Sequence, residues 1–312
     1  MIWDWLYVAV GLVILLLAGD ALVKGAVNLA LRIGIPALIV SLTIVAFGTS
    51  APELLIAIGA ILDGYPGLAL GNVVGSNTAN ILLVVGVPAI IATMHTSQCD
   101  SRHSFIQMIC ATALFIVLCF FQPITWIHGL ILLAALAAML THAGVTAKRH
   151  RDAQDDEIEG VEPGIGWPKI LFYLALGLIG LPLGADLLVE GSVNIARTFG
   201  VSETVIGLTL VAIGTSLPEL ATTVMAAIRR QADVALGNVI GSNMFNLLGI
   251  TGIAALVGPI PVEPRFLQVD LWIMLAASLL LIPFVFLRAD VTRLWGIGLT
   301  GLYAAYLVVI LA

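Results

Sequence analysis

Two glutamates occupy matching positions in otherwise apolar sequence, and each ends a Gly-Thr-Ser-x-Pro-Glu hexapeptide, at Glu53 and at Glu219. An acidic side chain at the centre of a membrane-spanning helix costs about 2.5–3.5 kcal/mol on insertion scales, so its presence indicates function or pairing. The structural alternative is a protonated glutamate that is hydrogen-bonded at a helix interface. The residues around both glutamates favour cation coordination instead.

The proline in each hexapeptide predicts a break in the helix that carries the glutamate. Pro52 has no amide hydrogen for the carbonyl of Gly48, and Pro218 has none for Gly214. Carbonyls freed at mid-membrane are tolerated only where protein or a hydrated cavity satisfies them, and broken helices supply such oxygens in transporters. Hydroxyl groups add to them, because Thr49 lies four residues before Glu53 and shares its helix face. The remaining hydroxyl residues of the two hexapeptides are Ser50, Thr215 and Ser216.

A second paired motif, Gly-Asn-x-x-Gly-Ser-Asn-x-x-Asn, begins at Gly71 and at Gly237. Its polar residues recur every four positions, so they form one stripe on an otherwise apolar helix and must face the protein interior. Gly71 and Gly75 also form a GxxxG pair, and tight helix packing is the alternative interpretation of Asn72 and Asn77. The stripe residues are Asn72, Ser76 and Asn80, and in the second copy Asn238, Ser242 and Asn246.

The predicted ligands are carboxylates, hydroxyls, amide oxygens and backbone carbonyls. This is the chemistry of hard cations such as Ca²⁺ or Na⁺, and it suits zinc or copper poorly. All five histidines lie outside the paired motifs, which disfavours a transition-metal site. Two ionised glutamates would be neutralised by one Ca²⁺ or by two Na⁺, so charge counting leaves the stoichiometry open.

Both motifs belong to one long internal repeat. Residues 20–86 and 186–252 align without a gap at a constant offset of 166, with about 30 of 67 positions identical. The chain therefore contains two copies of one unit. Paired intramembrane carboxylates at the interface of such repeats are typical of cation transport.

The composition places these repeats in a membrane. Mean hydropathy is +1.11, with 60% hydrophobic and only 10% charged residues, which excludes a soluble globular domain. Runs of about 20 apolar residues span a bilayer, and we expect ten, at approximately 4–26, 36–62, 68–93, 104–121, 124–143, 168–197, 202–228, 234–257, 267–287 and 291–311. The long polar stretch Lys148–Pro163 is interpreted as a linker. We expect a first repeat over 1–147, a linker over 148–166 and a second repeat over 167–312.

The basic residues predict the orientation. With both termini outside, 11 of the 13 lysines and arginines lie at cytoplasmic ends or in cytoplasmic loops, and only Arg197 and Arg265 lie outside. Five spans per repeat, an odd number, then makes the two copies inverted. The fold class that we expect is therefore an all-α membrane protein of ten transmembrane helices in two inverted five-helix repeats, with broken helices at the midplane.

One further acidic pair also matches across the repeats. Asp20 and Asp186 lie near the middle of the first and sixth expected spans. Two interpretations stay open for them. They could act in gating or in breaking a helix, or they could be buried and hydrogen-bonded for structural reasons.

The paired motifs resemble the α-repeats of the cation/Ca²⁺ antiporter superfamily, and most closely those of prokaryotic Na⁺/Ca²⁺ exchangers. The likeness covers nearly the whole chain. It implies secondary exchange of Ca²⁺ for Na⁺ by alternating access, with the first and sixth spans sliding past a rigid core. It further implies electrogenic exchange, no cofactor, Ca²⁺ and Na⁺ as substrates, and a prokaryotic plasma (inner) membrane location with the central linker cytoplasmic.

The resemblance also assigns ligands. Glu53 and Glu219 would bind Ca²⁺, and Na⁺ in turn, with backbone oxygens from Thr49 and Thr215. Flanking Na⁺ sites and the closing amides would come from Ser50, Ser76, Ser216, Ser242, Asn80 and Asn246, together with the carbonyls of Ala46 and Ala212. Some family members carry Asp where this chain has Asn246, and that Asp is linked to K⁺ co-transport. We therefore expect no K⁺ requirement.

Other functions are weighed against this one. Proton-coupled exchange of Ca²⁺ or another divalent cation is disfavoured, because Asn72 and Asn238 are followed by Gly75 and Gly241 where the proton-coupled branch has Glu. An intramembrane hydrolase lacks support, because the chain has no Gly-x-Gly-Asp or Gly-x-Ser-x-Gly sequence. A channel is the third alternative, which only a test of flux coupling separates from a carrier. We expect no enzymatic activity, no nucleic-acid partner and no obligate protein partner.

Overall fold

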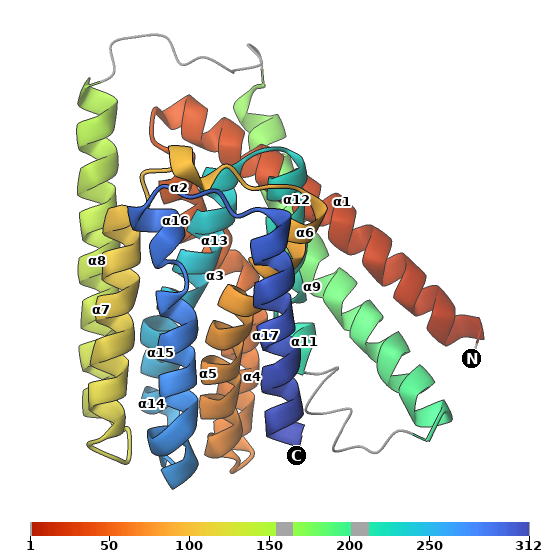
Figure 1. Ribbon diagram of the computed structural model, residues 1–312, viewed down its shortest axis with the longest axis vertical. Coiled ribbons are helices and arrows are strands. Elements are labelled where there is room, and N and C mark those ends of the chain that lie inside the picture. The colour runs from red at the N-terminus through yellow and green to blue at the C-terminus, as the bar shows by residue number, and fades with distance from the viewer. Residues whose placement is uncertain (1, 154–164, 201–211, 312) are drawn as a thin grey trace.

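The structure is a computed structural model that describes residues 2–153, 165–200 and 212–311. Across these residues the backbone is helical, and the only extended pairing there consists of two isolated bridges, Met94 with Val291 and Ile124 with Ile260. Figure 1 shows an upright bundle with two long tilted helices, α1 and α9, on one side of it. The predicted all-α class is confirmed.

The first half of the chain begins with the 32-residue helix α1 (Ile2–Ile33). A broken segment follows, in which a π-helical stretch and a bend separate short helices. Its parts are α2 (Ala37–Val40), η1 (Ser41–Val45), α3 (Ala46–Thr49) and α4 (Ala51–Leu62). The half continues with α5 (Pro66–Leu82), α6 (Gly86–Ile91), the single 3-10 turn η2 (Thr96–Gln98), α7 (Arg102–Cys119) and α8 (Trp126–Ala153).

The second half repeats this order where it is described. It begins with the 32-residue helix α9 (Trp167–Thr198). After residues 201–211 come α11 (Ala212–Thr215), α12 (Leu217–Ile228), α13 (Ala232–Met244), the π-helix η4 (Phe245–Ile250) and α14 (Thr251–Val257). The last elements are η5 (Phe266–Asp270), α15 (Leu271–Leu279), α16 (Ile282–Phe286) and α17 (Arg293–Leu311).

Seven helices of the described part are long and apolar enough to cross a membrane, or eight when α2–α4, bent by 42°, counts as one span. A multi-pass membrane protein is therefore confirmed, whereas ten spans and their inverted arrangement stay predictions. The expected span 202–228 begins in residues outside the described part, and its described helices, Ala212–Thr215 and Leu217–Ile228, have only 4 and 12 residues. The linker expected at 148–166 is also largely outside it.

Helices α1 and α9 pack with their backbones in contact. A Cβ atom added to Gly11 would lie 2.6 Å from the backbone nitrogen of Leu188 and 2.7 Å from the carbonyl oxygen of Gly184. Only glycine permits this approach, since any side chain would overlap the facing backbone. The two tilted helices in Figure 1 therefore form one closely packed pair.

The most enclosed of the apolar segments described is the one from α13 to α14, where 89% of an apolar 18-residue stretch is buried inside the protein. It packs against η1 of the first half, where a Cβ atom added to Gly241 would lie 2.4 Å from the carbonyl oxygen of Leu42. Ser41 also donates a 2.6 Å hydrogen bond to the carbonyl of Val234. The paired motifs of the two repeats thus meet in the interior of the bundle, and this contact positions the site.

Candidate cation site

Both glutamate-bearing helices begin after the same backbone break. Ser50 (φ −86°, ψ 6°) separates α3 from α4, and Ser216 (φ −88°, ψ 4°) separates α11 from α12. Pro52 and Pro218 then lie in the first turn of the new helix, where a missing amide hydrogen does no harm. The predicted break is therefore present in both copies, three residues before each glutamate.

The break places both carboxylates in the first turn of a helix and inside the protein. Glu53 is 1% exposed and Glu219 is 0% exposed. The two are near enough for their charges to interact. The predicted pairing of the two acids at one place is thus found in the structure.

Residues from both halves surround Glu219. Its Oε1 accepts hydrogen bonds from Ser50 Oγ at 3.0 Å and from Ser242 Oγ at 3.4 Å. Thr49 Oγ1 lies 3.5 Å from Ser242 Oγ and donates to Asn238 Oδ1 at 3.3 Å. The motif residues of α3, α12 and α13 therefore form one connected hydrogen-bond network.

Several buried oxygens of the predicted shell have no hydrogen-bond partner within the described part of the chain. A buried polar group without a partner is costly, so a set of them in one place indicates a ligand. These atoms are both carboxylate oxygens of Glu53, Oε2 of Glu219, Oγ of Ser216, Oδ1 of Asn80 and Oδ1 of Asn246. They are all hard oxygen donors, and the donor set fits Ca²⁺ or Na⁺.

The other predicted residues lie around this centre. Ser76 is buried in α5, and Asn246 is fully buried in the π-helix η4, a helix type that is frequent at functional sites. The carbonyl of Ala46 already accepts bonds from Thr49 Oγ1 at 3.2 Å and from the Ser50 amide at 3.0 Å. Ala212 begins α11, and its side chain lies outside the described part.

Two residues bond to predicted site residues in contacts that the sequence did not predict. Asn243 accepts a 3.0 Å hydrogen bond from Asn80 Nδ2, and its own Nδ2 donates to the carbonyl of Asn77 at 3.4 Å. Thr223 donates to the carbonyl of Glu219 at 2.7 Å and accepts from Asn238 Nδ2 at 3.2 Å. The identity of Asn77 and Asn243 across the repeat could have identified the asparagine pair, whereas Thr223 has no such signal.

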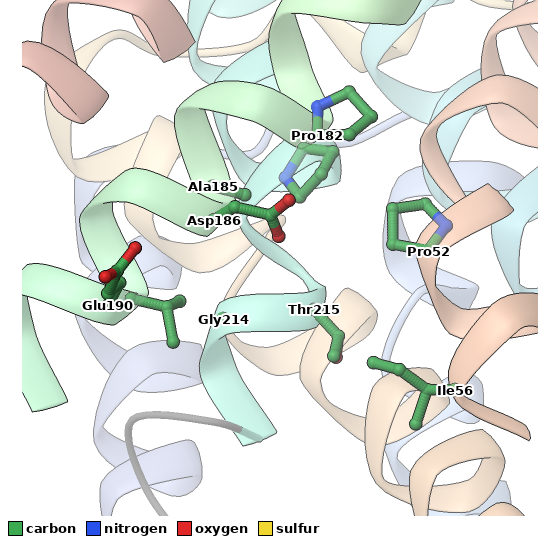
Figure 2. Close-up of a pocket in the computed structure, with 10 residues that line it drawn as sticks. Pro52, Ile56, Pro182, Ala185, Asp186, Glu190, Gly214 and Thr215 are labelled. Carbon is green, nitrogen blue, oxygen red and sulfur yellow. The ribbon is translucent and has the colours of Figure 1, made fainter. Parts of the chain in front are cut away.

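Two cavities reach the shell of the site. The first, of about 370 Å³, lies between α9 and the hexapeptides and is lined by Pro52, Asp186, Glu190, Thr215 and Pro218. Figure 2 shows Asp186 pointing from α9 into the space that Pro52 and Thr215 border. The second, of about 440 Å³, touches Asn72, Ser76 and Thr215. Both therefore offer routes by which a hydrated ion could approach the buried oxygens.

Comparison with known proteins agrees with this arrangement. The family model described as "Sodium/calcium exchanger protein" matches residues 3–145 and 169–312. The sodium/calcium exchanger MaX1 of Methanosarcina acetivorans is 34% identical, over 98% of both chains. The putative antiporter CaxA of Alkalimonas amylolytica is 36% identical, over 89% of this chain and 88% of that protein.

A solved structure of the sodium-calcium exchanger NCX_Mj, soaked without Na⁺ and Ca²⁺, superimposes with a TM-score of 0.84. It is 31% identical in sequence and covers 99% of both chains. The family match and these similarities extend over the same residues that build the buried oxygen shell. This chain is a member of the sodium/calcium exchanger family.

Proposed function

We propose that this protein is a secondary active antiporter that exchanges Ca²⁺ for Na⁺ by alternating access, electrogenically and without K⁺. The observation that carries the proposal is the pair of buried glutamates, Glu53 and Glu219, surrounded by buried oxygens without hydrogen-bond partners. Carboxylate and neutral oxygens at one place suit hard cations. The relatives named as sodium/calcium exchangers support this choice of ions.

The residues take the following roles in this proposal. Glu53 and Glu219 bind Ca²⁺ and supply the negative charge that Na⁺ neutralises in the alternate state. Thr49 and Thr215 contribute oxygens beside them. The flanking Na⁺ positions and the closing amides come from Ser50, Ser216, Ser76, Ser242, Asn80 and Asn246, with the carbonyls of Ala46 and Ala212. Substrates reach this shell through the cavities that Thr215 lines.

The orientation is part of the same proposal. The charge bias of the loops supports two termini outside and a cytoplasmic linker. The first of these cavities lies along the second half of α9, which lines it from Pro182 to Glu190, rather than at the beginning of that helix at Trp167. With this orientation the structure corresponds to a state that is open toward the outside.

The test is uptake of ⁴⁵Ca²⁺ into proteoliposomes that contain the purified protein. We expect uptake when the vesicles are loaded with Na⁺ and not when they are loaded with K⁺. Clamping the membrane potential at different values should change the rate, because electrogenic exchange moves net charge. Uptake that is independent of internal Na⁺ would contradict the proposal.

A second candidate is proton-coupled exchange. The Ca(2+)/H(+) antiporter ChaA of Bacillus subtilis is 27% identical over 83% of this chain and 78% of that protein, so the two coupling modes occur within recognisable similarity. In the same vesicles, uptake driven by a pH gradient in the absence of Na⁺ would favour this candidate.

A further inference from the structure

The repeat-related aspartates Asp20 and Asp186 lie in opposite surroundings. Asp20, on α1, is 20% exposed, forms an ion pair with Arg229 at the end of α12, and lies 3.0 Å from Lys24 Nζ. Asp186, on α9, lines the cavity of about 370 Å³ that reaches the site (Figure 2). The same position of the repeat therefore forms ion pairs in the first half and lines a cavity in the second.

The residues around the two aspartates explain why the contact exists on one side. At the repeat offset of 166, Lys24 corresponds to Glu190 and Arg229 corresponds to Asp63. The contact of Asp20 thus combines one acid with two bases drawn from both repeats, whereas the repeat-related positions hold three acids. The ion pair of Asp20 has no charge-complementary counterpart, because the positions equivalent to its two bases carry acidic residues.

The turn after α12 keeps Arg229 at this place. Arg230 adopts φ 58°, in the left-handed region that a residue with a side chain rarely occupies. Its repeat counterpart is Gly64, which has φ 84° and needs no such strain. The second copy therefore ends its glutamate-bearing helix with an arginine turn where the first uses glycine.

The ion pair joins α1 to the end of the helix α12, which carries Glu219. Arg229 terminates α12, whose first turn carries Glu219, and Asp20 belongs to α1, which packs backbone-to-backbone on α9. A cavity of about 290 Å³ at the linker end is lined by Lys24, Arg229 and Lys169. Its described lining includes no residue of the predicted cation shell.

We propose that the Asp20–Arg229 ion pair, assisted by Lys24, is a one-sided latch that closes the linker end of the ion pathway. The latch holds α1 on α12 while the site communicates with the other end, and it must open before the linker end can. Because the repeat-related positions of the opposite end hold acids in place of Lys24 and Arg229, the protein without ions favours the state seen here. This inference rests on the proposed alternating-access function.

The test measures which end of the pathway is open in the ion-free protein. A single reporter cysteine at Ile56, which lines both cavities that reach the site, is placed in a background without Cys99, Cys110 and Cys119. The labelling rate with a membrane-impermeant maleimide is compared with that of a reporter at Val23, which is buried beside the linker-end cavity. We expect Arg229→Gln to lower the Ile56-to-Val23 labelling ratio by about threefold or more, the scale of a partly exposed ion pair.

A double-mutant cycle separates a latch from general damage. Asp20→Asn alone should change the ratio like Arg229→Gln, and the double variant should match either single variant, because one interaction is removed in all three. Asp290→Asn, which removes an aspartate paired with His95 in a loop away from both reporters, is the control and should leave the ratio unchanged. An unaltered ratio in Arg229→Gln, or additive effects in the double variant, would overturn the latch.

A separate readout distinguishes failure of the latch from failure of the proposed function. Addition of Ca²⁺ should raise the thermal unfolding temperature of the unmutated protein and of all three latch variants, since the cation shell is intact in each. Loss of this shift in the variants would show that the ion pair acts on the site's structure and would count against the latch. No shift in the unmutated protein would instead contradict the cation site.

Discussion

The glutamates of the two repeats share a sequence motif, a backbone break and complete burial, yet their hydrogen bonding differs. Glu219 accepts bonds from Ser50 and Ser242, whereas neither oxygen of Glu53 has a partner within the described residues. The repeat equivalent of Ser50 is Ser216, whose hydroxyl is also without a partner. A symmetric sequence thus gives an asymmetric site, in which one acid is held by protein groups and the other is available to an ion.

The largest expected effect comes from neutralising either acid. Glu53→Gln and Glu219→Gln should each slow Ca²⁺ transport by at least about 100-fold, because loss of one partner in a buried charge interaction costs about 3–5 kcal/mol. The comparison becomes sharper in the ion-free protein: Glu53→Gln should raise the unfolding temperature, and Glu219→Gln should leave it nearly unchanged because the amide oxygen still accepts both serines. Glu263→Gln, at the mouth of the second cavity, is the control. Normal flux in either site variant would contradict the assignment.

The amides of the π-helix and of α5 should respond differently to an added charge. Asn246→Asp places a third carboxylate where the amide has no partner, so Ca²⁺ uptake should become proton-sensitive, falling about tenfold between pH 8 and pH 6. Asn80→Asp removes the bond to Asn243 and should instead lower stability by about 1 kcal/mol. Uptake as a function of pH and chemical unfolding would be measured for both. Identical behaviour of the two variants would argue against the asymmetry.

The two serines test the comparison at the level of single hydrogen bonds. Ser50→Ala should destabilise the ion-free protein by about 1 kcal/mol, because it leaves Glu219 short of a donor, and Ser216→Ala should have almost no such effect. Both should weaken Na⁺-dependent uptake, since both hydroxyls lie in the proposed shell. Equal destabilisation by the two substitutions would show that the hydroxyl of Ser216 has a partner after all.

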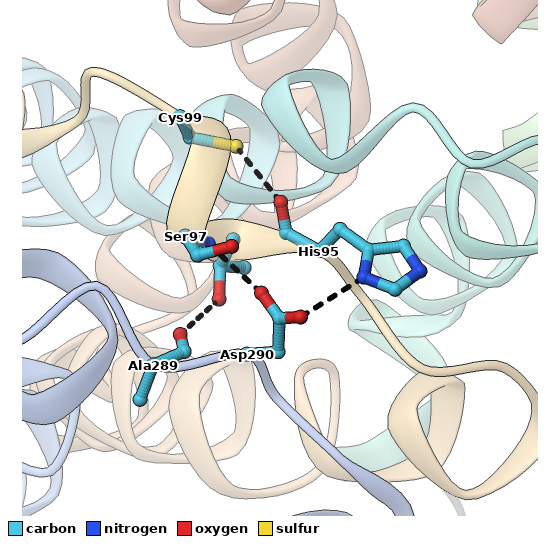
Figure 3. Close-up of polar contacts among 6 residues, drawn as sticks. His95, Ser97, Cys99, Ala289 and Asp290 are labelled. Carbon is cyan, nitrogen blue, oxygen red and sulfur yellow. Dashed lines mark hydrogen bonds and ion pairs between the residues drawn. The ribbon is translucent and has the colours of Figure 1, made fainter.

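The smallest effect is expected at a contact remote from the site, where loops of the two halves meet (Figure 3). Asp290 Oδ1 accepts the Ser97 amide at 3.0 Å, and Oδ2 lies 2.9 Å from His95 Nδ1. The hydrogen bonds from Ser97, and then the one from His95, hold the pKa of Asp290 below its ordinary value. Because the folded-state pKa lies below the unfolded value of about 3.9, the ionised carboxylate stabilises the folded protein. This stabilisation is complete above the unfolded pKa and is lost as the pH falls through the folded-state pKa.

Asp290→Asn should therefore lower the free energy of unfolding by about 0.5 kcal/mol at neutral pH, the scale of an exposed pair. The difference from the unmutated protein should vanish at acidic pH, below the folded-state pKa. Uptake of Ca²⁺ near neutral pH should be unaffected, unlike that of the Asn246→Asp variant. Chemical unfolding at several pH values checks this, and a difference that grows on acidification would contradict it.

The all-helical class and the helix breaks at the candidate site follow from the sequence because both depend on local chemistry. Apolar run length predicts spanning helices, and the prolines before Glu53 and Glu219 predict the breaks that the structure contains. The four-residue spacing of Ser76 and Asn80 likewise predicts their common burial.

The pairing of residues between the repeats was beyond sequence reasoning. A repeat predicts that Ser50 and Ser216 are equivalent, but which of them donates to a glutamate depends on how the halves approach each other. The Asp20–Arg229 ion pair shows the same limit, because its members are 209 residues apart and one of them has no chemical counterpart. The packing of the two halves therefore determines which of two repeat-equivalent residues forms a contact, and local sequence patterns do not.

The backbone contact between α1 and α9 bears on leakage. Helices that touch at Gly11 and Gly184 without intervening side chains have no room to shift separately. In the proposed alternating-access cycle, a pair that moves as one rigid unit uncovers one entrance as it covers the other, so an ungated pore through the bundle requires the pair to come apart. Substituting a bulky residue at Gly184 would separate the helices, and the resulting protein would dissipate ion gradients instead of coupling them.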